Sequence, residues 1–306
     1  MIVILGPTAI GKTRFAALIA DKLNGEIISA DSRQVYKGMS VGTGKDLDDY
    51  IVNGKIIPYH LIDIVEPDYE YNVFEFKRDF YKAYDDIIER NKKVILCGGT
   101  GMYIQSVLSN YKLTAVPVNK KLREKLELMS DEELVEMLSK MKKLHNHSDT
   151  TIRERLIRAI EIEEHQAIYN NDEEQRLISP DIIVGLEDER DIVRERITKR
   201  LKNRLEEGNL VAEVEQLMDS GVDSEKLKWF GLEYKFITMY ILGEISFDTM
   251  FEKLNTAIHQ FSKRQMTWFR RMEKQGFEIH WINSSLKDED KINIFLEKYS
   301  YLCQLK

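Results

Sequence analysis

The chain has 306 residues, of which 43% are hydrophobic and 32% are charged, and its formal net charge at pH 7 is −7. Because binding to phosphates requires lysine and arginine, this charge excludes a protein whose whole surface is a partner for nucleic acid. No apolar run approaches the roughly 20 residues that cross a bilayer, so we expect no membrane span and no membrane partner. The length suits one large domain with an elaboration, or two smaller domains.

The cysteines and the first residues of the sequence indicate where the protein works. Cys97 and Cys303 each lack the C-x-x-C partner of a zinc ribbon or a redox pair. The first apolar run, MIVIL, leads directly into a glycine-rich loop and has neither a basic leader nor a small-residue cleavage site. We therefore expect a globular protein of the reducing cytoplasm.

A glycine-rich loop, GPTAIGKT at 6–13, separates MIVIL from the helical pattern RFAALIADKL. The pattern G-x-x-x-x-G-K-[ST] is typical of a phosphate-binding loop, whose glycines let the backbone direct N–H groups at phosphate oxygens. The positive end of the following helix favours the same anion. Lys12 supplies a point charge, and Thr13 supplies a hydroxyl suited to Mg²⁺. The candidate phosphate-binding residues are Gly6, Pro7, Thr8, Ala9, Ile10, Gly11, Lys12 and Thr13.

Strand and helix signals alternate over the first hundred residues. Apolar runs at 1–5, 26–30, 60–65 and 93–99 indicate strands, and helical patterns cover 13–23 and 74–90. This alternation predicts an α/β fold, with a parallel sheet of the P-loop NTPase type and helices on both faces. Ligands then gather at the carboxyl ends of the strands.

Polar residues follow the second predicted strand. Asp31 ends the run EIISA and is expected close to the phosphate loop, which makes it a candidate general base or metal ligand. The alternative is that Asp31 and Ser32 cap the next turn. Arg33, Gln34 and Tyr36 add donors, acceptors and an aromatic ring, a set suited to a base edge or another heterocycle.

The run KVILCGG at 93–99 has no aspartate where a mechanical ATPase would hold its Mg²⁺-bound water, and this disfavours a motor or signalling protein. Asp63, in HLIDIV, is the nearest substitute, although it is flanked by apolar residues and can equally be a turn residue. Thr100, directly after KVILCGG, either donates a hydroxyl into the cleft or caps a helix.

The sequence changes character after Tyr111. The segment from Lys120 to Gln166 is rich in Glu, Lys and Leu at helical spacing and has no strand candidate. A strand signal returns at 180–187 and is followed by three helical stretches and a strand candidate at 278–282. We therefore predict a discontinuous phosphate-binding core, 1–112 and 180–306, with a helical insertion at 113–179.

Two basic runs occur in the later part of the chain. From Arg190 to Arg204 there are seven basic residues against two acidic ones, and from Lys263 to Lys274 there are five against one. Each is either a solvated helix face or a nucleic-acid contact. Aromatic residues accompany the second run, and Trp229 precedes Phe230 and a glycine; such rings either stack on unpaired bases or pack in the core. His145 and His147 show no third ligand and are expected at the surface.

Together these segments resemble one family, the tRNA dimethylallyltransferases, also called isopentenyl-tRNA transferases, of bacterial type. The resemblance covers nearly the whole chain in order. It rests on GPTAIGKT, SADSRQVYKGMSVGTGK at 29–45, LCGGTGMYIQS at 96–106, RLIRAIE at 155–161 and KRQMTWFRR at 263–271.

The resemblance implies transfer of a dimethylallyl group from dimethylallyl diphosphate to the exocyclic amine, N6, of adenosine 37 in tRNA, with release of pyrophosphate. Lys12, Thr13 and the loop amides would bind the diphosphate with Mg²⁺ at Thr13, and Asp31 would accept the amine proton. The insertion would grasp the tRNA, and a monomeric enzyme is expected. The tRNA-binding residues that the resemblance implies are Asp31, Ser32, Arg33, Gln34, Thr100, Asn119, Arg155 and Arg158.

Two positions depart from the family pattern. Glu233 stands where an arginine is frequent in relatives, so the sequence does not identify the basic residue that reaches the diphosphate from the later part of the chain. Asn119 stands where many relatives have aspartate.

Three alternatives use the same residues. A small-molecule kinase would move a phosphoryl group from ATP at the same loop, and a related prenyltransferase would use free AMP as the acceptor. The RLIRAIE segment and the insertion favour a macromolecular acceptor. A non-enzymatic RNA-binding module would have no need of Asp31.

Overall fold

The computed structural model describes residues 1–109, 116–141, 153–168, 176–206 and 209–304. The chain folds into two compact units. The core unit comprises residues 1–109 and 177–306, and the insertion unit comprises residues 110–176. No described helix combines the length and the apolar character that a membrane crossing requires.

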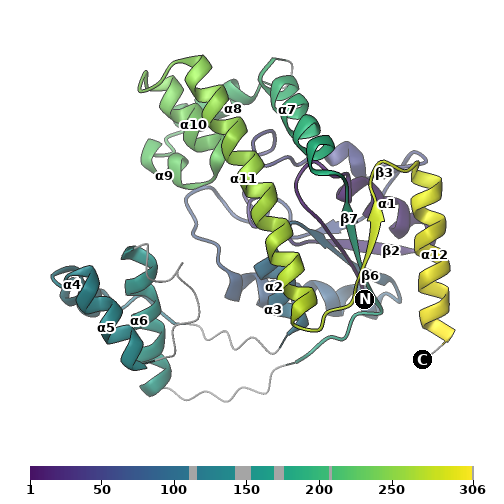
Figure 1. The fold of residues 1–306 in the computed structure, drawn as a ribbon, viewed down its shortest axis with the longest axis horizontal. Coiled ribbons are helices and arrows are strands. Elements are labelled where there is room, and N and C mark those ends of the chain that lie inside the picture. The colour runs from purple at the N-terminus through teal and green to yellow at the C-terminus, as the bar shows by residue number, and fades with distance from the viewer. Residues whose placement is uncertain (110–115, 142–152, 169–175, 207–208, 305–306) are drawn as a thin grey trace. The chain divides into compact units, whose positions relative to one another are not determined.

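The core unit contains a six-stranded sheet in the order β5-β2-β6-β1-β7-β8 (Figure 1). Every pairing in this sheet is parallel, which confirms the predicted fold class. The central strands are apolar and buried because helices cover both faces. The strands are β1 (Ile2–Leu5), β2 (Gly25–Ser29), β5 (Tyr59–His60), β6 (Lys93–Gly98), β7 (Ile182–Glu187) and β8 (Ile279–Asn283).

The helices that connect the first strands lie on opposite faces of the sheet. The chain runs from β1 to β2 through α1 (Lys12–Leu23) in one direction, and from β5 to β6 through α2 (Val73–Glu89) in the other. Because parallel crossovers are right-handed, α1 and α2 must cover different faces. The C-terminal helix α12 (Asp288–Gln304) packs on α1, and α11 (Phe247–Lys274) packs on α3 (Gly101–Leu108). Figure 1 shows β7 and β8 between α11 and α12.

The strand predicted at 60–65 is wrong beyond His60. Leu61 and Asp63 have φ angles of 61° and 53°, so the backbone turns away from the sheet there. Its N–H groups bind the segment after β2 instead, since Asp63 N donates to Gln34 O at 3.0 Å and Val65 N donates to Val35 O at 3.0 Å. The apolar side chains of this run, Leu61 and Ile62, are buried beneath a loop, which explains the strand-like pattern.

The polar stretch after β2 contains a small hairpin. A 3-10 turn, η1 (Leu47–Tyr50), leads into β3 (Ile51–Val52) and β4 (Lys55–Ile56), which pair antiparallel. Asn53 and Gly54, between them, have φ angles of 52° and 74°, the geometry of a two-residue turn that matches the strand twist.

Five described helices, rather than the predicted three, lie between β7 and β8. The additional breaks follow glycines with positive φ, at Gly221 (92°) and Gly231 (154°). A further helix, α12, lies in a stretch for which no element was predicted. The five helices are α7 (Arg190–Glu206), α8 (Leu210–Asp219), α9 (Ser224–Trp229), α10 (Leu232–Ile241) and α11.

The elements of regular structure among the described residues of the insertion unit are all helices, and the unit has its own small core. It comprises α4 (Lys120–Glu127), α5 (Asp131–Met141) and α6 (Arg153–Ile168). Leu134, Leu138, Leu156 and Ile160 are central to that core. His145 and His147 lie outside the described residues.

Candidate active site

The phosphate loop connects β1 to α1 in a conformation that depends on its glycines. Gly6 has a φ angle of 151°, and a β-carbon there would lie 2.6 Å from the backbone oxygen of Leu186 in β7. Gly11, with a φ angle of 81°, precedes α1, and no side chain caps the helix at that position. The first N–H groups of α1 are therefore available to an anion, and the helix dipole adds to the attraction.

Lys12 lies beside this loop with its ammonium group buried. Its Nζ donates to the carbonyl oxygen of Pro7 at 2.5 Å. Burial, with a smaller contribution from the charge of Arg200, lowers the pKa of Lys12 to about 8, although the charges of Cys97 and Asp31 act in the opposite direction. Asp31, just after β2, lies close enough for its charge to act on Lys12, in line with the expectation that the residues at the ends of β1 and β2 are near one another.

Arg200, on α7, is a second buried cation at the loop, and the sequence did not single it out. Its Nη2 donates to Thr8 Oγ1 at 2.5 Å. Burial, with a smaller contribution from the charge of Arg204, lowers the pKa of Arg200 to about 10, although the charge of Glu233 acts in the opposite direction. A signal was present within the basic run, because Arg200 lies seven residues after Val193, on the helix face that is buried.

Glu233 is an acidic residue whose charge acts on Arg200 and Arg204. Burial raises the pKa of the Glu233 carboxyl group, and the charges of Arg200 and Arg204 oppose that shift. The chain thus brings a carboxyl group close to guanidinium groups from α7.

Gln265, on α11, joins the phosphate loop to the end of β6. Its Oε1 accepts a hydrogen bond from Thr8 N at 2.8 Å, and its Nε2 donates to Gly99 O at 2.9 Å. The side chain is only 7% exposed. Gln265 belongs to the KRQMTWFRR motif, but no role was predicted for it. The signal was its position, seven residues after Ile258 and four before Phe269 on the buried face of a long helix.

The acceptor rim, defined here as residues 31–34 with Thr100, lies at the carboxyl ends of β2 and β6. Asp31 Oδ1 accepts from Arg33 N at 2.9 Å, so the predicted turn-capping contact exists. Ser32 N donates to Thr100 Oγ1 at 3.0 Å. Thr100 precedes α3, but its side chain does not cap that helix. The structure therefore brings together five of the residues predicted to contact tRNA.

Gln34 lies at the rim, where a ligand could reach it, whereas the side chain of Tyr36 is buried. Gln34 accepts from Ser29 Oγ and donates to Gly44 O, both at 3.1 Å, which fixes its amide at the rim. Tyr36 is buried with its ring 4.8 Å from that of Phe230, and its hydroxyl accepts from Tyr71 N. The expectation that Tyr36 presents a ring to a heterocycle is wrong, because the ring belongs to the core.

The segment after the rim is held by Glu213 of α8. This carboxylate accepts hydrogen bonds from three consecutive N–H groups, those of Ser40 at 2.8 Å, Val41 at 2.7 Å and Gly42 at 2.9 Å. The hydroxyl of Tyr234 donates to the same carboxylate at 2.7 Å. A residue about 170 positions away thereby fixes the backbone that supports Gln34, and no local pattern in the sequence indicated it.

A buried ammonium group holds the other end of this segment. Lys45 Nζ donates to Tyr36 O at 2.6 Å and forms an ion pair with Asp63. The carboxylate of Asp63, considered from sequence as a substitute for a water-holding aspartate, is thus paired with Lys45.

Cys97 and Cys303 are both free thiols in different surroundings. Cys97 is buried at the end of β6, and burial raises its pKa to about 12 despite the opposing charge of Lys12. Cys303 is exposed on α12.

Three predicted tRNA-binding residues belong to the insertion unit. The Asn119 side chain accepts from Leu122 N at 3.1 Å and caps α4. Arg158 forms an ion pair with Glu161 and donates to Val116 O at 2.7 Å. Burial would raise the pKa of Glu161, but hydrogen bonds from arginine side chains outweigh it and lower that pKa. Arg155, by contrast, is exposed.

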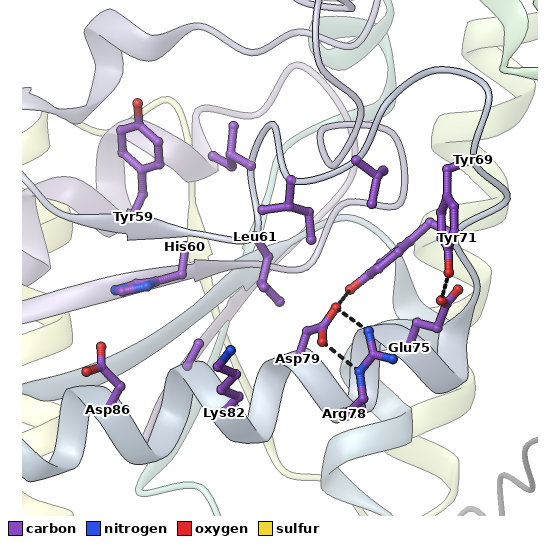
Figure 2. A pocket seen from close by; sticks show the side chains of 14 residues that line it. Tyr59, His60, Leu61, Tyr69, Tyr71, Glu75, Arg78, Asp79, Lys82 and Asp86 are labelled. Atoms are coloured by element: carbon purple, nitrogen blue, oxygen red, sulfur yellow. Dashed lines mark hydrogen bonds and ion pairs between the residues drawn. The ribbon is translucent and has the colours of Figure 1, made fainter.

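A pocket of ≈ 550 Å³ between β5 and α2 lies apart from the residues described so far (Figure 2). Polar side chains that line it are already paired: Tyr71 donates to Asp79 at 3.0 Å, Arg78 binds the same carboxylate at 2.8 Å, and Tyr69 donates to Glu75. None of the phosphate-loop or rim residues lines it. The pocket is therefore not the place where those residues act.

The phosphate loop, two buried cations and a carboxylate at the next strand end define a class of protein: a P-loop fold that binds a polyphosphate and holds a second reactant beside it. A family model described as IPP transferase matches residues 34–272, and one described as isopentenyl transferase matches residues 1–58. The chain belongs to this family, and the resemblance inferred from its motifs is confirmed.

Individual relatives agree over nearly the whole chain. The chain is 56% identical to tRNA dimethylallyltransferase 2 of Phocaeicola vulgatus over 292 residues, which are 95% of each chain. Among solved structures, it is similar to the full-length tRNA isopentenylpyrophosphate transferase of Bacillus halodurans, with 30% identity and a TM-score of 0.70 over 99% of this chain and 98% of that one. The corresponding enzyme of Staphylococcus epidermidis gives 33% identity and a TM-score of 0.67, with 97% and 98% covered.

Proposed function

We propose that the protein is a tRNA dimethylallyltransferase, which transfers the dimethylallyl group of dimethylallyl diphosphate to N6 of adenosine 37. The names of the relatives support a tRNA acceptor rather than free AMP or a kinase substrate. The observation that carries the proposal is the carboxylate of Asp31 next to a phosphate loop lined by Lys12 and Arg200. The groups that would bind the leaving diphosphate and the group that would assist the nucleophile thus lie at the ends of nearby strands.

The loop side of the site binds the diphosphate. The loop amides from residue 9 to 13, Lys12 and Arg200 stabilise the negative charge that grows on the pyrophosphate as the bond from C1 of the allyl group to oxygen breaks. Such preorganised donors are usually the largest catalytic term. Arg200 is the cation from the later part of the chain that the sequence left unidentified. The pairing of Asp63 with Lys45 fits transfer to an amine rather than hydrolysis, since no water has to be positioned.

The rim side binds the adenine. Its exocyclic nitrogen attacks C1 of the allyl group, the electron pair of the broken bond leaves on pyrophosphate, and the Asp31 carboxylate accepts one N6 proton. Because the amine is a poor nucleophile, positioning contributes alongside the base. Ser32, Arg33, Gln34 and Thr100 supply hydrogen-bonding groups around the extruded base.

The residues present fit a bound Mg²⁺. Thr13 lies in the first turn of α1, and its hydroxyl makes no hydrogen bond to another described residue. No cluster of three or more acidic, histidine or cysteine ligands occurs among the described residues. Mg²⁺ commonly takes one or two protein ligands, several waters and substrate phosphates, so one hydroxyl is sufficient. The ion would neutralise charge on the departing pyrophosphate.

The remaining features of the proposal concern the whole chain. The insertion unit contributes RNA contacts, with Arg155 as its exposed cation within RLIRAIE. A monomeric enzyme is part of the proposal. A tRNA acceptor supports a cytoplasmic location.

The product of the reaction tests the proposal directly. The protein is incubated with Mg²⁺, dimethylallyl diphosphate and a tRNA with adenosine at position 37, and digested nucleosides are analysed by mass spectrometry. We expect dimethylallyladenosine and pyrophosphate in equal amounts. Parallel reactions with AMP as the acceptor, and with ATP in place of the prenyl donor, should give no product. Prenylation of AMP without prenylation of tRNA would refute the proposal.

A further inference from the structure

Trp229 is a large side chain left in solvent at the end of α9. It is 55% exposed and is one of three tryptophans in the chain. The other two are engaged: Trp268 packs against Gly101, and Trp281 donates from Nε1 to Glu273 at 2.8 Å. The exposed indole of Trp229 presents a large, flat apolar face on which the ring of a partner can stack.

The backbone around Trp229 is rigid. The following residue, Phe230, is fully buried with its ring edge-on to Tyr36 and 6.1 Å from the ring of Trp229. Gly231 comes next with a φ angle of 154°, a conformation that other residues rarely adopt. Trp229 is thus held in place by Phe230, which packs on Tyr36 just after the acceptor rim.

Arg33 connects this ring to the acceptor rim. Its guanidinium carbon lies 5.4 Å from the centroid of the Trp229 ring, within the range of a cation–π contact. Its backbone N–H binds the Asp31 carboxylate at 2.9 Å. No carboxylate among the described residues forms an ion pair with Arg33, whereas Lys228, beside Trp229, is paired with Glu225 and Glu244.

We propose that Trp229 and Arg33 form a stacking platform for one unpaired nucleobase adjacent to the acceptor adenosine. The inference rests on the proposed function, because it takes the RNA to be a single-stranded loop. Extruding the acceptor nucleotide breaks its stacking with its neighbours. An aromatic face with a guanidinium beside it gives a displaced neighbour a new stacking partner, and the cation attracts its phosphate.

The test measures kcat/KM with anticodon stem-loop RNAs, either intact or with one nucleotide next to the acceptor made abasic. On intact RNA, Trp229→Ala should lower kcat/KM roughly 5- to 150-fold, as expected for the loss of one aromatic–base stack. Trp229→Leu, which keeps apolar bulk without a ring, should be equally impaired, and Trp229→Phe should retain most of the activity. On the RNA that lacks the stacked base, wild type and Trp229→Ala should be equal.

The matched control is Tyr301→Ala, since Tyr301 is 56% exposed and lies 5.9 Å from Lys298 on α12. It should leave kcat/KM unchanged, and no Trp229 variant should change the affinity for dimethylallyl diphosphate. A Trp229→Leu enzyme as active as wild type, or a loss that is the same on every abasic RNA, would overturn the platform. Failure of the wild type to modify any tRNA would instead overturn the proposed function.

Discussion

The phosphate loop and the acceptor rim occupy neighbouring strand ends but are built in different ways. The loop is contiguous in sequence, and its shape follows from Gly6 and Gly11 and from the helix that begins behind it. The rim is an irregular segment whose shape depends on distant groups, above all on Glu213 and on the Lys45–Asp63 pair. The shape of the phosphate loop is therefore determined by residues near in sequence, whereas the shape of the acceptor rim is determined by tertiary contacts.

The largest expected effect comes from the carboxylate at the rim. Asp31→Ala should lower single-turnover prenylation about 10²- to 10⁴-fold, the usual contribution of a positioned base. The affinity for tRNA, measured by filter binding, should change much less. A variant that binds tRNA weakly yet reacts at the normal rate once saturated would show that Asp31 only shapes the rim.

Arg200 tests the loop side in the same way. Arg200→Ala should reduce kcat/KM for dimethylallyl diphosphate about 10²- to 10³-fold, because a preorganised donor to the leaving group is lost. Arg194→Ala, on an exposed position of the same helix, is the matched control and should have little effect. Equal losses in the two variants would indicate a general effect of charge on α7.

Lys12 makes diphosphate binding depend on pH. Because burial lowers the Lys12 pKa to about 8, the ammonium is charged below that pH and loses its proton above it. The second pKa of a phosphate ester is about 6, so the ligand itself no longer titrates in this range. The affinity for dimethylallyl diphosphate, measured by calorimetry, should therefore fall above pH 8. The fall should approach about tenfold for each further pH unit. Lys12→Arg should remove this dependence, and a flat profile in the wild type would contradict the assignment.

Substitution of Glu213 should have the smallest effect on activity. It also gives the sharpest test of whether the phosphate loop and the acceptor rim are independent. Glu213→Gln keeps the size of the side chain but removes the charge that three N–H groups share, so residues 40–42 should become less ordered. We expect kcat/KM for tRNA to fall about 3- to 10-fold, with unchanged affinity for dimethylallyl diphosphate. Glu215→Gln, on an exposed position of the same helix, is the control. Loss of diphosphate affinity would show that the two regions are not independent.

The same contrast explains what could be predicted from the sequence. The parallel sheet, the loop, and the nearness of Asp31 to Lys12 follow from local patterns and from the rule that ligands gather at strand ends. Arg200, Gln265 and Glu213 reach the site from more than 170 residues away. Their places on buried helix faces hinted at a role for Arg200 and Gln265, whereas no local pattern indicated Glu213. The roles assigned to Asn119, Arg155 and Arg158 remain predictions.

The errors also have a physical origin. The run at 60–65 is apolar because it is buried, but its backbone bonds to the segment after β2 rather than to a strand. Tyr36 belongs to a polar stretch, yet its ring fills the core against Phe230. In the first case hydrophobicity indicated burial correctly but not the hydrogen-bonding partner, and in the second the polar neighbours concealed the burial of the ring.

Because the two cysteines differ in exposure, one of them can be labelled selectively. Thiol reagents react with the thiolate, and a thiol with a pKa of about 12 is almost never in that form at neutral pH. A maleimide dye should therefore attach to Cys303 on the C-terminal helix and spare Cys97 near the reaction centre. The natural sequence thus already permits a single, site-selective fluorophore, with which RNA encounter and departure can be followed without engineering the protein.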